Sequence, residues 1–200
     1  MLPIESVPGH PDYRALGAIE GILVDLRYAT ADNFMGVNLY APLDCAWLHR
    51  EAAEKLERSA KALAARRADL RLLVLDALRP QRVQERIWRS VVGTKFEPYL
   101  AEPVRGSIHS FGMAVDVTIA GADGIQLDMG TPFDDLTELS HPSLEARFVR
   151  EKALEPKHVE NRTLLRDVMG EGGWRGISTE WWHFDGGERV KIRAEYARVL

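Results

Sequence analysis

The sequence has little of what marks secreted, membrane-spanning or nucleic-acid-binding proteins. Cys45 is the one cysteine among 200 residues, which excludes an intramolecular disulfide framework and a cysteine-rich zinc finger. Lysine and arginine number 26 against 30 acidic residues, and the net charge of -4 leaves no basic footprint for nucleic acid. No apolar run approaches the roughly 18 residues needed to cross a bilayer.

The first residues, MLPIESVPGH, have no basic segment followed by an apolar one, so no secretion signal is visible. We therefore expect a cytoplasmic protein without membrane or nucleic-acid partners, and leave its oligomeric state open. With 46% hydrophobic and 28% charged residues, the composition is typical of a globular chain. A single domain over 1–200 is expected, with an irregular N-terminal arm at 1–20 and a C-terminal tail at 186–200.

Hydrophobic periodicity predicts the elements of this domain. Apolar residues recur at threes and fours between Asp44, a candidate N-cap, and Arg67, which predicts the clearest helix. Further helices are expected at about 80–91 and 158–170, strands at 21–27, 70–75, 113–119 and 174–184, and a long loop at 28–43. Helices mixed with hairpin-type strands predict an α+β fold, with a mainly antiparallel sheet flanked by helices.

Asp116 stands in the middle of an otherwise apolar strand, between Val115 and Val117. A carboxylate there costs several kcal/mol unless it is paired or binds a metal. His109 precedes it by seven residues, with Gly112 between them. Because glycine permits a turn or bulge, the chain can bring His109 back beside Asp116.

A second histidine with a nearby carboxylate lies in Glu180-Trp181-Trp182-His183. The aromatic residues favour a strand. In a regular strand, residues three apart point to opposite faces. Glu180 and His183 therefore serve one site only if the strand begins after Glu180 or is bulged there, and we predict such a break.

Two histidines and one carboxylate form a ligand set that suits Zn²⁺. His109, Asp116 and His183 would bind one ion per chain and leave a fourth position open, as in catalytic zinc sites. Zinc lowers the pKa of the water it binds to roughly 7. Glu180, three residues from a ligand, would then be the base that takes a proton from this metal-activated water.

Arg79 follows the apolar strand at 70–75, and its guanidinium could stabilise an oxyanion. Each of these residues also has a plainer explanation. The histidines could be packed and hydrogen-bonded in a metal-free core. Asp116 could be paired with an arginine, and Arg79 with Asp76.

Two segments together resemble a known family. Ser-x-His-x-x-Gly-x-Ala-x-Asp, at Ser107–Asp116, and Glu-x-Trp-His, at Glu180–His183, are similar to the signature pair of the D-alanyl-D-alanine dipeptidases, which are zinc peptidases. Weaker similarities, over most of 20–185, lie at Tyr28-Ala29-Thr30, Asn33-Phe34, Leu78-Arg79-Pro80, Met129–Asp134 and Asn161-Arg162. Leu78 replaces an aromatic residue of the family pattern.

The resemblance implies that His109, Asp116 and His183 bind zinc, that Glu180 is the general base and then the general acid, and that Arg79 stabilises the oxyanion. It also implies Asp134 near the free amino group of a small dipeptide, and Ser107 near its carboxylate. Asp134 could instead be a turn or helix cap, and Ser107 a hydrogen-bonding loop residue. The expected reaction is hydrolysis of D-alanyl-D-alanine, in cell-wall recycling or in antibiotic resistance.

Other functions stay open at this point. A zinc D,D-carboxypeptidase or L,D-endopeptidase would use the same metal chemistry on longer cell-wall peptides. A non-catalytic zinc-binding module would keep the three ligands and could lose the base. Glu180 is present, which argues against the non-catalytic zinc-binding module.

Overall fold

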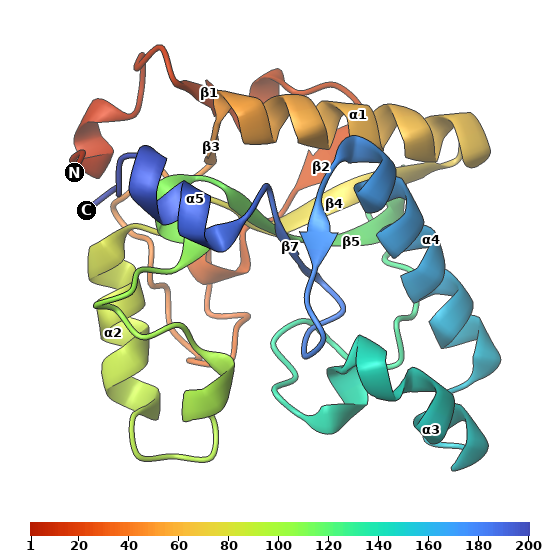
Figure 1. Cartoon of the computed structure of the whole chain (residues 1–200). Helices are drawn as coiled ribbons and strands as arrows, with labels where there is room; N and C mark the ends of the chain where they lie inside the picture. Colours follow the sequence, from red (N-terminus) through yellow and green to blue (C-terminus); the bar gives the residue numbers. More distant parts are fainter.

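The centre of the molecule is a five-stranded sheet, seen in a computed structural model that describes residues 1–200 (Figure 1). Its strands are β2 (Ile22–Val24), β4 (Leu70–Asp76), β5 (Ala114–Gly121), β6 (Arg175–Gly176) and β7 (His183–Asp185). Their spatial order is β2-β4-β5-β7-β6. Only the β2–β4 pair is parallel. The prediction of an α+β fold with a mainly antiparallel sheet is confirmed.

Helices and a second, two-stranded sheet surround this sheet. The α-helices are α1 (Arg50–Arg66), α2 (Gln81–Val91), α3 (Glu145–Arg150), α4 (Pro156–Gly172) and α5 (Arg189–Glu195). The small sheet pairs β1 (Tyr13–Ala15) with β3 (Trp47–His49). Seven 3-10 turns complete the list: η1 (Ile4–Ser6), η2 (Leu16–Ala18), η3 (Arg27–Ala29), η4 (Glu97–Tyr99), η5 (Ile108–Phe111), η6 (Glu138–Ser140) and η7 (Pro142–Leu144). None of the helices is long and apolar enough to cross a bilayer.

The main core lies where α1 and α4 pack together beside the sheet. The buried face of α1 includes Ala52, Leu56 and Leu63, at the three- and four-residue spacing of one helix face. These residues belong to the same apolar cluster as Leu72 of β4 and Val117 of β5. This packing holds the central strands rigidly, and the candidate residues stand on those strands or on the loops beside them.

The start of the first helix was predicted wrongly. Asp44 accepts hydrogen bonds from the backbone of Ala46 and the indole of Trp47, so it organises a turn and caps no helix. The next residues, 47–49, pair with β1 as strand β3. Helix α1 begins only at Arg50, with His49 as its N-cap. Long-range pairing thus overrides the local helical pattern.

The predicted strand at 174–184 is interrupted. Only 175–176 and 183–185 pair as strands, and Trp181 and Trp182 lie outside both. The break that we predicted near Glu180 is present, because β7 begins at His183. The tail after 185 forms α5 and then a bridge from Val199 to Leu2, which keeps both termini on one side of the molecule (Figure 1).

Candidate active site

A pocket of about 330 Å³ opens where β5 and β7 lie side by side. All seven residues singled out from the sequence line it: Arg79, Ser107, His109, Asp116, Asp134, Glu180 and His183. They come from segments up to about a hundred residues apart in the chain. The structure therefore brings every candidate residue to one cavity.

Strand register brings two of the candidate ligands together. Asp116, the third residue of β5, is the direct cross-strand partner of His183, the first residue of β7. On its other side Asp116 faces Asp76 of β4. The β4–β5 ladder shifts register between Val74 and Asp76, and such irregularities commonly re-aim a side chain next to a site.

His109 reaches the same place from η5, the 3-10 turn that precedes β5. The turn ends at Gly112, whose φ of 64° lies in the left-handed region. A Cβ at this position would lie 2.8 Å from the backbone nitrogen of His49. Glycine is required both by the backbone conformation and by this close approach, so the sequence-based expectation of a turn here is confirmed.

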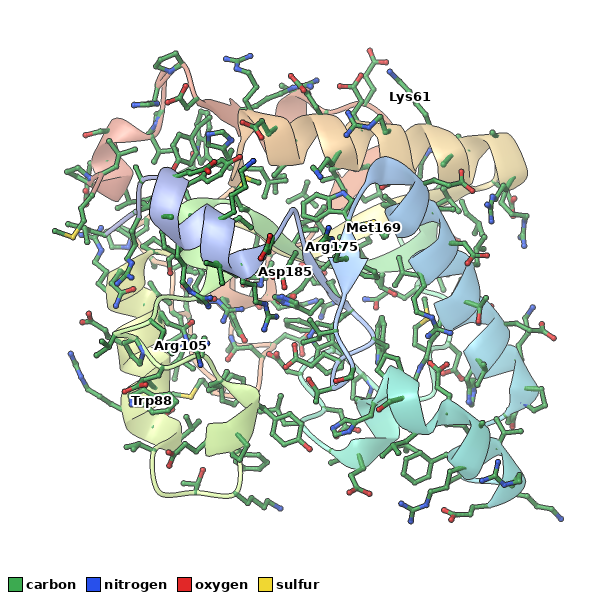
Figure 2. The ribbon with its side chains drawn as sticks, viewed as in Figure 1. Lys61, Trp88, Arg105, Met169, Arg175 and Asp185 are labelled. Carbon is green, nitrogen blue, oxygen red and sulfur yellow. The ribbon has the colours of Figure 1, made fainter.

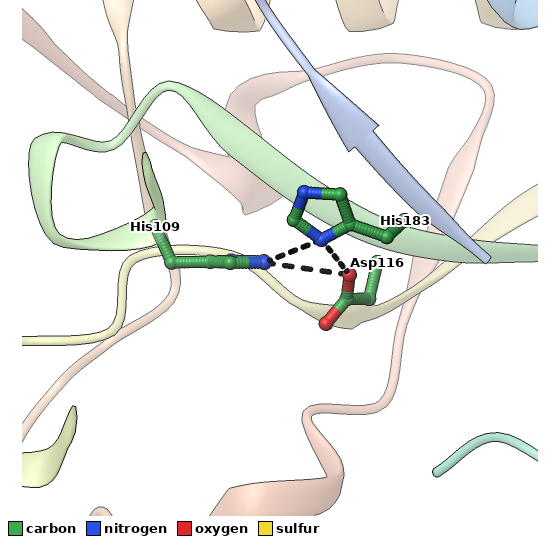
Figure 3. A group of neighbouring side chains, drawn as sticks. All are labelled: His109, Asp116 and His183. Carbon is green, nitrogen blue, oxygen red and sulfur yellow. Dashed lines mark hydrogen bonds and ion pairs between the residues drawn. The ribbon is translucent and has the colours of Figure 1, made fainter. Parts of the chain in front are cut away.

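The three inner atoms of the cluster form a tight triangle (Figure 3). His109 Nε2 lies 3.2 Å from His183 Nδ1 and 3.3 Å from Asp116 Oδ1, and the third side is 3.0 Å. Ligands bound at about 2.0–2.1 Å to a tetrahedral ion lie about 3.3–3.4 Å from one another. The triangle therefore has nearly the dimensions of three corners of a metal site.

In each histidine, the ring nitrogen that faces away from the triangle, which we call the outer nitrogen, already makes a hydrogen bond within the protein. His109 Nδ1 donates to the carbonyl oxygen of Ala77 at 2.7 Å, and His183 Nε2 donates to Asp185 Oδ1 at 3.0 Å. In neutral imidazoles these bonds leave the inner nitrogens without protons. Three lone pairs, two from nitrogen and one from a carboxylate, then point at one space. This donor set fits a metal ion.

A proton replaces that cation when no metal is bound. Burial alone would lower the pKa of His183, but hydrogen bonds to Asp116 and Asp185 outweigh it and raise the pKa to about 10. Burial would raise the pKa of Asp116, yet the charges and hydrogen bonds of the two histidines hold it well below its usual range. A metal ion bound at this site would therefore displace a proton.

Glu180 presents a half-buried carboxylate to the pocket. Burial raises its pKa to about 7, against the opposing attraction of His183. A carboxylate with a pKa near neutrality can accept a proton in one step and return it in the next. A carboxylate in this pocket with this pKa is suited to proton transfer.

Arg79 is buried and held from several sides. Its Nε and Nη2 donate to Asp76 Oδ2 at 2.9 and 2.6 Å, and Nη1 donates to Gln84 at 3.2 Å. The Tyr28 ring lies 4.8 Å from its guanidinium carbon. The ion pair with Asp76, which we considered as the plainer explanation, does exist. It also fixes the guanidinium at the pocket wall, 3.5 Å from Asp116 Oδ2.

Asp134 is held in an uncommon conformation. Its φ is 64°, a region that non-glycine residues rarely adopt. Tyr28 donates its hydroxyl to Asp134 Oδ1 at 3.1 Å, while Oδ2 is buried without a partner. Burial, and then the charge of Asp116, raise the pKa of Asp134 well above its usual value. Asp134 caps no helix, since the next one begins at Glu138.

Ser107 stands directly before η5 and is buried at the pocket wall. Its side chain makes no capping hydrogen bond to the turn. The hydroxyl is therefore not used to organise the turn that positions His109.

Sequence reasoning missed the residues that orient this cluster. Asp185 is two residues after His183, and a period of two puts both on one face of a strand, so the signal was present. Asp76 accepts a hydrogen bond from the hydroxyl of Tyr40 and lies 3.5 Å from His109 Nδ1. Sequence reasoning considered Asp76 only as a partner of Arg79. No sequence pattern indicated three further arginines that line the pocket: Arg105, Arg189 and Arg193.

The sequence is similar to known proteins over most of its length. The family model described as D-ala-D-ala dipeptidase matches residues 12–199. A D-alanyl-D-alanine dipeptidase of Escherichia coli K12 is 36% identical over 162 residues, covering 81% of this chain and 77% of its own. One of Enterococcus faecium is 31% identical, covering 83% and 86%. A solved structure of the LdcB LD-carboxypeptidase aligns at a TM-score of 0.40 and 18% identity, over 92% of this chain and 73% of that one.

Proposed function

The chain belongs to the D-ala-D-ala dipeptidase family, and on that premise we propose that it is a zinc-dependent dipeptidase that hydrolyses D-alanyl-D-alanine. The observation that carries the proposal is the triangle of lone pairs from His109, Asp116 and His183, inside a pocket that also holds an unpaired glutamate. Two imidazoles and one carboxylate suit Zn²⁺. When bound, the ion would polarise the scissile carbonyl and lower the pKa of a water molecule.

The chain itself supplies proton transfer and charge stabilisation. Glu180 removes a proton from the attacking water, whose oxygen adds to the carbonyl carbon of the peptide bond. Arg79, held by Asp76, stabilises the negative charge that develops on the carbonyl oxygen. Glu180 then returns its proton to the leaving nitrogen, the carbon–nitrogen bond breaks, and two molecules of D-alanine result.

The two ends of the pocket suit the two charged ends of a free dipeptide. The partnerless Oδ2 of Asp134 matches the ammonium group of the substrate, which would also lower the raised pKa of this carboxyl. Ser107, beside His109, offers a hydroxyl to the substrate carboxylate. A peptide with a blocked amine would leave Asp134 unpaired, and such an unmatched buried charge disfavours binding.

The test combines metal analysis with an assay of amino-acid release. We expect about one zinc ion per chain, and release of D-alanine from D-alanyl-D-alanine, with much slower cleavage of the L,L isomer and of N-acetyl-D-alanyl-D-alanine. Glu180→Ala serves as the matched inactive variant. Cleavage of the N-acetylated or longer peptides in preference to the free dipeptide would instead support a carboxypeptidase or endopeptidase. Metal-loaded protein that cleaves none of them would refute the proposal.

A further inference from the structure

Three arginines that line the pocket, Arg105, Arg189 and Arg193, lie close enough for their charges to act on one another, and we call them the arginine wall. Arg189 and Arg193 are four residues apart on α5 and therefore project from the same face of that helix. Arg105 comes from the segment between α2 and η5, and Figure 2 labels it beside α2, below α5. No sequence motif predicted this cluster, and the proposed reaction does not use it.

The arginine wall has too few anionic partners within the protein. Arg189 donates from Nε to Asp185 Oδ2 at 2.6 Å. Arg193 donates only to the backbone oxygen of Gly106, at 3.2 and 3.1 Å, and the exposed side chain of Arg105 has neither an ion pair nor a hydrogen bond. Burial, and then the charges of Arg105 and Arg189, lower the pKa of Arg193. Of the three arginines, only Arg189 therefore has a carboxylate partner.

Glu102, three residues before Arg105, is an acidic residue that also lines the pocket. It is exposed and forms no ion pair with the three arginines. The arginine wall therefore presents an excess of positive charge to the cavity. In a partly closed pocket such an excess attracts anionic groups more strongly than it would on an open surface.

The position of the arginine wall relates it to one end of the substrate. Arg193 binds the carbonyl oxygen of Gly106, the residue before Ser107. It therefore lies on the side where the substrate carboxylate is expected, and Asp134 with Tyr28 provides for the ammonium group. One C-terminal carboxylate needs at most one bidentate arginine. D-Alanyl-D-alanine has only methyl side chains, so it leaves the remaining guanidinium groups unmatched.

The pocket also has room for more than two methyl groups. Its volume of about 330 Å³ falls in the range of roughly 300–1,000 Å³ that is usual for pockets of drug-sized ligands. We propose that this enzyme also cleaves dipeptides whose C-terminal residue carries an acidic side chain, and that it prefers them. This inference rests on the proposed function. The side-chain carboxylate would pair with Arg105 and Arg193, because a planar guanidinium matches a carboxylate in a bidentate geometry.

The experiment compares kcat/KM of the zinc-loaded enzyme for D-alanyl-D-glutamate and D-alanyl-D-glutamine, which have nearly the same shape and differ in one charge. D-Alanyl-D-alanine is the reference substrate. We expect about a tenfold preference for the glutamate dipeptide over the glutamine dipeptide. The preference should shrink as salt is added, since Arg105 is exposed and its charge is screened.

Two matched variants assign the preference to the arginine wall. Arg105→Gln should bring the glutamate-to-glutamine ratio close to one. Arg86→Gln removes the same charge from the exposed face of α2, away from the pocket, and should keep the parent ratio. Both positions are exposed, so neither substitution threatens folding.

The outcomes separate this inference from the proposed function. Cleavage of D-alanyl-D-alanine with a glutamate-to-glutamine ratio of one or less overturns the inference and leaves the dipeptidase proposal intact. A glutamate-to-glutamine ratio that survives Arg105→Gln, or that falls equally with Arg86→Gln, overturns the role of the arginine wall. Failure to cleave any of the three dipeptides overturns both proposals.

Discussion

The pocket has two ends that are built in opposite ways. At the metal end, Asp116 and His183 stand on paired strands, and the outer atoms of His109 and His183 are bound by the protein itself. At the substrate end, Asp134 stands on a loop with a positive φ and leaves one buried oxygen unpaired. The side chain of Arg105 has no partner in the protein either.

The difference shows which polar groups of the pocket make their hydrogen bonds within the protein before any ligand binds. A metal site needs ligands of fixed tautomer and direction, so its outer atoms are satisfied within the fold. A substrate site gains specificity from groups that remain unsatisfied until the right molecule arrives. A buried and unpaired carboxylate such as Asp134 lowers the stability of the protein without substrate. The fold tolerates this loss at a site that is meant for recognition.

The largest expected effect comes from breaking the metal end. His109→Ala removes one corner of the triangle and should abolish both stoichiometric metal binding and dipeptide hydrolysis. Elemental analysis and the alanine-release assay measure the two losses. His10→Ala, a change in the N-terminal segment outside the pocket, is the control. Full metal content in His109→Ala would exclude the histidine as a ligand.

Glu180→Gln should separate chemistry from metal binding. We expect kcat to fall by roughly 10²–10⁴-fold, the usual contribution of a general base, with zinc content unchanged. In the parent enzyme the rate should fall as the pH drops and Glu180 becomes protonated. The midpoint should lie at or below about 7, because a bound cation favours the ionised carboxylate. A variant whose rate is near that of the parent would contradict this role.

Asp185→Asn tests whether the outer hydrogen bond tunes the metal end. The amide is a poorer acceptor for His183 Nε2, so zinc affinity should fall by roughly 10–100-fold. Competition with a chelator measures the affinity, and excess zinc should restore most of the activity. Since His183 holds a proton up to a pKa of about 10 in the metal-free protein, the affinity of the parent should also weaken as the pH is lowered.

The smallest expected effect lies at the substrate end. Asp134→Asn should lower kcat/KM for D-alanyl-D-alanine by about tenfold, through the loss of one charge-assisted hydrogen bond. Because the pKa of Asp134 is raised in the folded protein, the parent loses stability as the pH rises above the unfolded value. The variant should lack this loss, and denaturant unfolding at pH 4 and pH 7 would measure it. An equal loss in both proteins would contradict the assigned cause.

Much of the metal end could be predicted from the sequence, and little of the substrate end. A carboxylate in an apolar strand and a histidine beside aromatic residues conflict with their local surroundings, and such conflicts are visible without a structure. Arg105 and Arg193 conflict with nothing near them in the sequence, because an arginine in a polar segment is ordinary. Only the contact of α5 with η5, which joins distant segments, reveals the arginine wall.

The same limit explains the errors in the fold. The helical pattern after Asp44 was real, but residues 47–49 pair with a strand more than thirty residues earlier. No local pattern records that partner, so the helix was started too early. The break before His183 could be predicted because it followed from a local geometric conflict between Glu180 and His183.

The C-terminal segment that forms a bridge with Leu2 also bears on the order in which the parts of the candidate site are made and assembled. The backbone nitrogen of Val199 donates to the carbonyl oxygen of Ser110 at 2.7 Å, and Gln81 donates to the carbonyl oxygen of Val199. The turn that carries His109 is therefore tied to a segment that leaves the ribosome after every candidate ligand. All three candidate ligands are therefore synthesised before the segment that holds this turn in place. If the three residues bind a metal, we expect full affinity only after this C-terminal segment has packed against the turn.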